Sequence, residues 1–191
     1  MGFMDTLLGR GKRIGKPKVD ALFRLSTALY TIQSSFRADR TGYAGVCFRP
    51  EPEATFADTQ QEITDLLRIN DFGTKYWVRR DSFGYSWLVL YDRDFEELIT
   101  LLHMASQVFI DNGYGKQILC AAFEFEAERQ TIYLIYKYKR GKFYPFAPLE
   151  RSEQTRDHSL ELRMKAKLGD ELPIESKLEE WYPLWGIPFR E

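Results

Sequence analysis

Apolar residues recur every three or four positions in four segments of the chain, which is the spacing of an amphipathic helix. The segment 94–112 has the widest apolar face, begins at Asp94 with Glu97 three residues later, and ends at Asn112-Gly113. An acidic cap followed by a glutamate favours a helix start, and glycine favours a left-handed stop. We therefore predict helices over residues 19–36, about 55–70, 94–112 and about 155–168, with the third buried most deeply.

Alternation of apolar and polar residues, the pattern of a strand, marks two further regions. The segments 75–81 and 85–92 flank a turn at Asp81–Gly84, and the segments 117–127 and 130–139 flank the pair Glu128-Arg129. Each region therefore predicts a β-hairpin.

Proline limits the remaining extended segments. The run 43–48 is ended by Pro50 and Pro52, which predicts a short strand at a sheet edge. The aromatic segment 143–148 contains two prolines, which lack a backbone donor, so we predict an ordered strip that crosses the domain and not a central strand. In 181–189, aromatic residues between prolines and a glycine indicate a docked C-terminus.

The predicted elements follow the order helix, strand, helix, hairpin, helix, hairpin, helix. Because the strand–helix–strand units of a parallel sheet do not recur, we expect residues 19–191 to form a single α+β domain. Its sheet should be mainly antiparallel, built of hairpins and flanked by helices. Of the 191 residues 44% are apolar, which is enough for one core. The expected core includes Leu98, Leu102, Phe109, Phe123, Ile132 and Leu134.

Charge and hydropathy exclude several classes of protein. The 27 Lys and Arg residues against 28 Asp and Glu residues give a formal charge of −1, which argues against a strongly basic nucleic-acid binder and against an acidic disordered chain. The longest apolar runs fall far short of the roughly 20 residues needed to cross a bilayer, so we expect no membrane-spanning helix.

The N-terminal segment, residues 1–18, carries five cations and one anion. Two interpretations stay open. In the first, this basic, flexible segment touches an anionic membrane, where each cation contributes about 1 kcal/mol. In the second, its first turn docks on the domain and a solvated linker follows. The residues assigned to membrane contact are Phe3, Leu7, Leu8, Arg10, Lys12 and Arg13.

The sequence offers few residues for catalysis or metal binding. It contains no glycine-rich phosphate loop, paired-cysteine zinc motif or Gly-x-Ser-x-Gly elbow, and its only histidines are His103 and His158. Cys47 and Cys120 lie in apolar runs, which predicts two buried, reduced thiols in a cytoplasmic protein. A disulfide between them stays an alternative, which requires that their strands are neighbours. We expect no catalytic residue, metal or cofactor. The alternative is a small thiol-dependent enzyme or hydrolase that uses Cys47 or Cys120 with His103.

Between Tyr136 and Tyr144, four cations are interleaved with four aromatic residues. This strip could form an exposed surface for a protein partner, or bind nucleic acid weakly through residues 137–142. A third interpretation is structural, with the aromatic residues in the core and the cations in water. The net charge disfavours a nucleic-acid partner. The residues assigned to partner binding are Lys139, Arg140, Lys142, Phe143, Tyr144 and Phe146.

Six motifs spread over the whole chain are distinctive. They are the opening Met1–Arg10, the strand Val46–Pro50, the turn Asp81–Trp87, the strip Tyr138–Leu149, the triplet Leu160–Leu162 and the ending Trp181–Gly186. Together they resemble the PspAB family of PspA-associated proteins. The resemblance implies that the chain acts beside PspA, the phage-shock membrane-stress protein, and beside an HtpX-like membrane protease, and it implies no catalytic residue. The order of helices and hairpins is also similar to the secretion-chaperone-like fold of YbjN-type proteins, in topology alone.

We therefore expect a non-enzymatic adaptor or regulatory protein of the PspA-type membrane (envelope) stress response that acts by protein–protein interaction. Its expected partners are a PspA-like coiled-coil protein and an HtpX-like membrane protease. Its expected location is the cytoplasm, with peripheral contact at the inner face of an anionic membrane.

Overall fold

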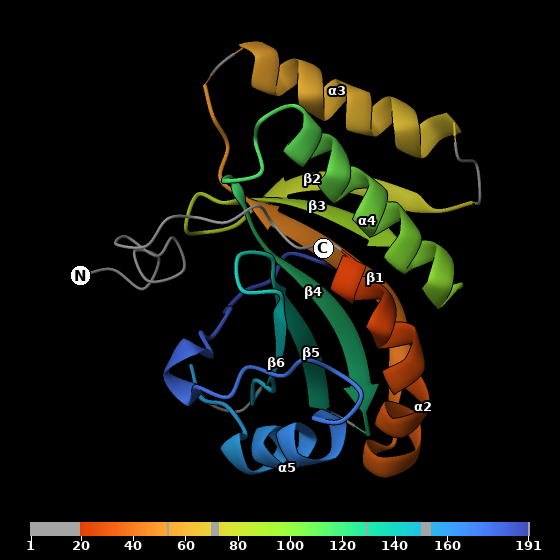
Figure 1. Cartoon of the computed structure of the whole chain (residues 1–191), viewed down its shortest axis with the longest axis vertical. Helices are drawn as coiled ribbons and strands as arrows, with labels where there is room; N and C mark the ends of the chain where they lie inside the picture. Colours follow the sequence, from red (N-terminus) through yellow and green to blue (C-terminus); the bar gives the residue numbers. More distant parts are fainter. Residues whose placement is uncertain (1–19, 53, 70–72, 129, 150–153, 191) are drawn as a thin grey trace.

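A sheet of six strands lies at the centre of the fold (Figure 1). The computed structural model describes residues 20–52, 54–69, 73–128, 130–149 and 154–190. The strands are β1 (Ala38–Phe48), β2 (Lys75–Arg80), β3 (Ser86–Tyr91), β4 (Ile118–Ala127), β5 (Gln130–Lys137) and β6 (Lys142–Phe146). They lie in the order β2-β3-β1-β4-β5-β6, and every neighbouring pair is antiparallel. The predicted α+β fold and both predicted hairpins are confirmed.

Helices form at the four segments where the apolar spacing predicts them. The carboxylate of Asp94 accepts hydrogen bonds from the backbone N–H groups of Glu96 and Glu97, and the chain leaves the third helix through Gly113, whose φ is 85°. Within the described residues, two short 3-10 helices add to these four. The helical elements are η1 (Asp20–Phe23), α2 (Arg24–Phe36), α3 (Ala54–Ile69), α4 (Phe95–Asp111), α5 (His158–Leu168) and η2 (Leu178–Glu180).

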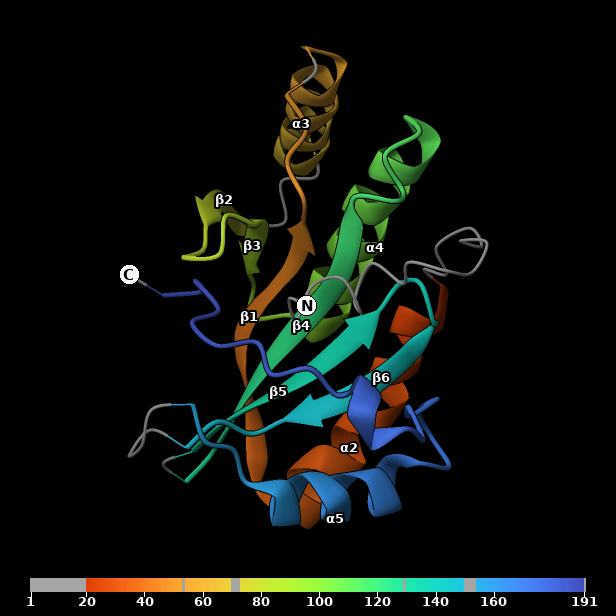
Figure 2. The ribbon, with the colours of Figure 1, turned by 90° about the vertical axis from the view of Figure 1, so that its left-hand side faces the viewer.

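Different parts of the chain cover the two faces of the sheet. The helices α2 to α5 contribute to one core, together with strand residues such as Phe123 and Leu134. The C-terminal segment, residues 174–190, runs across the other face and packs Trp181 and Phe189 on the strands. Figure 2 shows this segment in front of the strands, with α2 and α4 behind them. Because both faces are covered, strands such as β4 are apolar over nearly their whole length.

The predicted core and the predicted docking of the aromatic C-terminus are both confirmed. All six residues named for the core are buried, and the buried part of the C-terminal segment includes Trp181, Leu184 and Phe189. None of the helices in the described residues is both long and apolar enough to cross a membrane.

The prediction of a short edge strand over 43–48 was wrong. β1 begins at Ala38 and lies in the middle of the sheet, with β3 on one side and β4 on the other. Pro50 and Pro52 follow the last residue of this strand, so they limit its length and leave its backbone free to pair on both sides.

The strip over 143–148 proves to be mostly an edge strand, β6. Phe143 directs its backbone away from β5, because its N–H donates to the carbonyl of Pro173 and its carbonyl accepts from the N–H of Glu175. Pro145 lies two residues further along the strand and therefore points its nitrogen in the same outward direction. The missing donor of Pro145 consequently breaks no bond to β5, which is why a proline is tolerated here.

Candidate functional site

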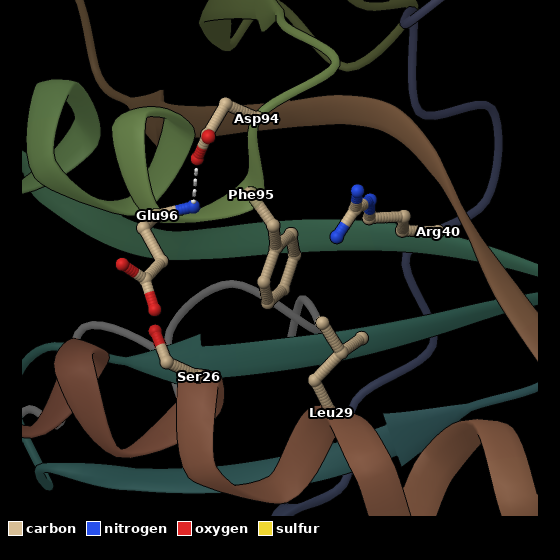
Figure 3. Close-up of a pocket in the computed structure, with 6 residues that line it drawn as sticks. All are labelled: Ser26, Leu29, Arg40, Asp94, Phe95 and Glu96. Carbon is tan, nitrogen blue, oxygen red and sulfur yellow. Dashed lines mark hydrogen bonds between the residues drawn. The ribbon is translucent and has the colours of Figure 1, made fainter.

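A small cavity opens between α2, β1 and the start of α4 (Figure 3). Its volume is about 210 Å³, below the range of about 300–1,000 Å³ that is typical of ligand pockets. It is lined by Ser26, Leu29, Arg40, Asp94, Phe95 and Glu96.

The polar side chains of this cavity have limited chemistry. The carboxylate of Asp94 is occupied as the helix cap, because it accepts from the backbone of Glu96 at 2.9 Å and of Glu97 at 3.1 Å. Figure 3 shows the Glu96 carboxylate pointing toward Ser26, with Arg40 on the other side of Phe95. The lining therefore offers no thiol, imidazole or amine beside which a substrate could be activated.

Cys47 and Cys120 face each other directly across β1 and β4. Both are free and buried, on the face of the sheet that the C-terminal segment covers. Burial raises the pKa of the Cys47 thiol, and the neighbouring Cys120 thiol raises it further. The prediction of two buried free thiols is confirmed, and their strands are neighbours.

His103 lies on α4, on the opposite face of the sheet from both thiols. Its Nε2 is 3.4 Å from Oδ1 of Asp20, and its ring centroid is 4.9 Å from that of Phe23. The sheet therefore separates this imidazole from Cys47 and Cys120, and the structure does not bring together the residues of the thiol-enzyme alternative.

The other histidine, His158, is exposed at the start of α5, where its Nδ1 lies 3.3 Å from Glu161. Among the described residues, no group of three or more histidine, cysteine or carboxylate side chains is arranged to hold a metal ion.

The aromatic half of the predicted partner-binding surface needs a correction. Phe143, Tyr144 and Phe146 are completely buried. Phe143 belongs to the core on the helical side, whereas Tyr144 and Phe146 pack beneath the C-terminal segment. These three side chains fill the two cores because the strand directs successive residues to opposite faces of a sheet that is covered on both sides. Because they are buried, these three side chains cannot contact a partner in this fold.

The cations of the strip lie at the turn between β5 and β6, where glutamates of the C-terminal segment pair with them. The Nζ of Lys137 lies 2.6 Å from Glu180, and Arg140 binds the Glu175 carboxylate and lies 3.5 Å from Glu180. The Nζ of Lys142 lies 3.8 Å from Glu175. We call Lys137, Arg140, Lys142, Glu175 and Glu180 the charge cluster.

Burial distinguishes the members of this cluster. The side chain of Lys137 is 3% exposed and that of Glu175 is fully buried, whereas Arg140 and Lys142 are about one-third exposed. Burial lowers the pKa of Lys137, although its contact with Glu180 acts in the opposite direction. Burial alone would raise the pKa of Glu175, but the hydrogen bond from Arg140 and the nearby cations reverse this and hold the pKa below its usual value.

The charge cluster changes the interpretation of the basic strip. Because Glu175 and Glu180 offset half of the charge of the four cations in the strip, the strip presents less positive charge than its sequence indicates, which weakens the nucleic-acid alternative. Lys139, Arg140 and Lys142 are all partly exposed, so the cationic half of the predicted surface is accessible. The residues predicted to touch a membrane, Phe3, Leu7, Leu8, Arg10, Lys12 and Arg13, lie outside the described residues.

Comparison with known protein families gives a match over nearly the whole chain. The model of one protein family, PspAB (PspA associated protein B), matches residues 1–189, nearly the whole chain. No curated protein and no solved structure matches the chain.

Proposed function

Because this chain belongs to the PspAB family, we propose that it is a non-enzymatic adaptor or regulatory protein that binds a PspA-like coiled-coil protein. The observation that carries the proposal is the extent of the family match, which includes both cores, the charge cluster and the N-terminal segment. The family's description names an association with PspA and no chemical reaction.

The arrangement of the described side chains supports an adaptor better than an enzyme. The two thiols are buried and lie on the other side of the sheet from His103. The cavity beside α4 is small, and the only group beside its hydroxyl, that of Ser26, is the carboxylate of Glu96, with no imidazole or thiol in the lining (Figure 3). A protein-binding surface needs no nucleophile or base, because recognition depends on a stable shape and on ordered charges.

We assign the partner contact to the cations at the β5–β6 turn, which are Lys139, Arg140 and Lys142. Arg140 and Lys142 are held in position by Glu175, so little side-chain entropy is lost when they meet a second carboxylate. A coiled coil presents rows of charged side chains beside its apolar seam, and its carboxylates are suitable acceptors for these cations.

The proposal includes a cellular location and a second partner. We place the protein in the cytoplasm, in the phage-shock type of membrane stress response, with an HtpX-like membrane protease as a second partner. Peripheral contact with the inner face of an anionic membrane would be made by Phe3, Leu7, Leu8, Arg10, Lys12 and Arg13.

The test is a direct binding measurement with the purified PspA-like protein of the same organism. We expect saturable binding that Lys139→Glu weakens about tenfold, since reversing a charge at the rim of an interface opposes association. The matched control is Arg93→Glu. Arg93 is an exposed cation that follows β3, at the end of the sheet away from the β5–β6 turn, so this variant should leave the affinity unchanged.

Three outcomes decide the proposal. Loss of affinity in Lys139→Glu alone supports both the partner and the assigned surface. Equal effects of the two variants would show a general effect of charge and would move the contact away from the turn. Absence of binding by the unchanged protein would overturn the assignment of a PspA-like partner.

A further inference from the structure

One edge of the sheet is available for pairing. β2 is the outermost strand beside β3, and within the described residues its outer side pairs with no other segment. Figure 2 shows β2 outside β3. The end of the C-terminal segment reaches β2 through a side chain, because Arg79 donates to the carbonyl of Arg190. The opposite edge is different, because residues 173–175 bind the outer side of β6 at Phe143.

The register of the hairpin identifies the backbone groups that point outward from β2. The N–H of Asp81 donates to the carbonyl of Tyr85 at 2.9 Å, and these two residues extend the register that pairs Lys75 with Tyr91. Hydrogen-bonded pairs alternate along an antiparallel ladder, so Lys75, Trp77 and Arg79 bond inward to β3. The N–H and C=O groups of Tyr76, Val78 and Arg80 therefore point away from the sheet.

The side chains along this edge favour a partner of one charge. Lys75 and Arg80 are exposed, and Val78, between them, is 51% exposed. Within the described residues, no carboxylate forms an ion pair with Lys75 or Arg80, and β2 itself contains no acidic residue. Arg79 is already occupied, because it stacks over Trp77 and its Nη1 donates to the carbonyl of Arg190. The edge thus combines unpaired backbone groups, an apolar centre and two exposed cations.

From this geometry we propose that β2 binds an extended, acidic segment of another protein, which adds a seventh strand to the sheet. Backbone hydrogen bonds to Tyr76, Val78 and Arg80 supply the pairing, as in other cases of strand addition. Carboxylates of the segment meet Lys75 and Arg80, and an apolar side chain meets Val78. This site lies at the opposite edge of the sheet from β6 and from the cations assigned to the coiled-coil partner.

A second copy of this chain fits the edge less well. Pairing two β2 strands would bring Lys75, Arg79 and Arg80 of each copy into one short interface. The carboxylate that follows β2 in the chain, that of Asp81, is occupied by the hairpin turn, where it accepts from the backbone of Phe83 and Tyr85 and from the indole of Trp87. The edge therefore favours an acidic partner over its own copy.

The probe for this site is the seven-residue peptide Glu-Thr-Val-Thr-Thr-Glu-Thr, blocked at both ends. Because side chains alternate between the two faces of a strand, antiparallel pairing of this peptide with β2 places its glutamates opposite Arg80 and Lys75 and its valine opposite Val78. Added to the full-length protein, it should shift the backbone amide signals of Tyr76, Val78 and Arg80 in nuclear magnetic resonance spectra, in a saturable manner. The same peptide with every backbone amide N-methylated, and a version with lysine in place of glutamate, should both fail to bind.

A pair of variants isolates the backbone contribution. Val78→Pro removes an N–H that points outward and leaves the bonds from β2 to β3 in place, so it should weaken binding of the peptide about tenfold. Val78→Ala keeps this N–H and should bind nearly as well as the unchanged protein. Neither variant should alter binding of the PspA-like protein, so this inference and the proposed function can fail separately.

Four outcomes would overturn the proposal. They are absence of binding at about 1 mM peptide, equal binding of the N-methylated peptide, equal binding of the lysine peptide, and a concentration-dependent dimer held together by β2. If Val78→Pro fails to fold, the two modified peptides still decide the matter on the unchanged protein.

Discussion

Gly45 is the residue that lets the C-terminal segment lie directly on the sheet. A Cβ atom at this position would lie 2.8 Å from Cε1 of Phe189 and 2.9 Å from the carbonyl oxygen of Leu88. A side-chain ring can move by a few tenths of an ångström, but the carbonyl belongs to the backbone of β3. Close approach of Phe189 and β3 therefore explains a glycine in the middle of a central strand, where glycine is otherwise unfavourable.

Replacing Gly45 by alanine should therefore destabilise the protein. We expect a loss of about 1–3 kcal/mol in the free energy of unfolding, which is typical of overpacking a core by one carbon atom. Denaturation by urea, followed by circular dichroism, measures this loss.

Phe189→Ala provides the control for this clash. In that background Gly45→Ala should be less harmful than in the unchanged protein, because one of the two close contacts has been removed. An equal loss of stability in both backgrounds would contradict the account of Phe189 given above.

The two cysteines show how far a single residue can be understood from sequence. Their burial could be predicted, because the apolar neighbours of Cys47 and Cys120 lie beside them in the chain. That they face each other could not be predicted, because it depends on the register of β1 against β4, and nothing local to either residue specifies that register.

At the level of elements, the charge cluster ties the C-terminal segment to the β5–β6 turn. The pKa values of Glu175 and Glu180 are held below the ordinary value of 4.5, because hydrogen bonds and cations outweigh the burial that would raise them. A carboxyl whose pKa is lower in the folded chain stabilises the fold above its unfolded pKa. This stabilisation is lost as the pH falls through the folded pKa.

We therefore expect the protein to lose stability as the pH falls below about 4.5, and Glu175→Gln to reduce this dependence. At pH 7 the same change should lower the free energy of unfolding by about 1–3 kcal/mol, since it weakens the buried acceptor that binds Arg140. Urea denaturation at several pH values between 3 and 7 measures both effects.

The matched control is Glu179→Gln, an exposed residue of η2 outside the charge cluster. This variant should leave both the stability at pH 7 and its pH dependence nearly unchanged. Identical pH profiles for Glu175→Gln and the unchanged protein would refute the role given to the cluster.

Elements that form within a short stretch of chain could be predicted well from the sequence. The helices and both hairpins depend on periodicity, caps and turns, which are local signals. The position of a strand in the sheet depends on distant partners, which is why the local pattern predicts an edge position for β1 although this strand pairs with both β3 and β4. The rule that proline avoids central strands held for Pro145, but it could not show that the strip pairs with β5.

In the candidate site too, local features could be predicted from the sequence and contacts between distant segments could not. The alternation of cations and aromatic residues was visible in the sequence, and one interpretation of it placed the aromatic residues in the core. The acceptors Glu175 and Glu180 come from a segment that follows α5, and no periodicity connects them to Arg140. The only signal in the sequence is that Glu175 and Glu180 stand shortly before the aromatic segment 181–189, which is predicted to dock on the domain.

At the level of the whole molecule, residues 1–18 stand apart in composition from the domain that follows them. We expect the protein to float with anionic liposomes at low salt and to detach as the salt concentration rises, because salt screens the attraction between cations and lipid. Deleting residues 1–18 should abolish flotation, measured by centrifugation of liposomes in a density gradient.

Liposomes of neutral lipid are the control and should leave the protein at the bottom of the gradient. Flotation that persists after the deletion would place the lipid contact elsewhere, for example at the partly exposed cations of the β5–β6 turn. A deletion variant that no longer folds would show that the segment is a structural part of the domain.

The two-sided covering of the sheet has a practical consequence for following motions of this protein. All four tryptophans lie at the core between the sheet and the C-terminal segment: Trp87 and Trp181 are buried in it, and Trp77 and Trp185 pack against it. None belongs to the core on the helical side. Tryptophan fluorescence therefore reports on that face alone, whereas far-ultraviolet ellipticity reports mainly on the helices of the other. If the segment lifts when a partner binds, emission will shift to longer wavelength while the helical signal stays constant, so the opening can be observed without any added label.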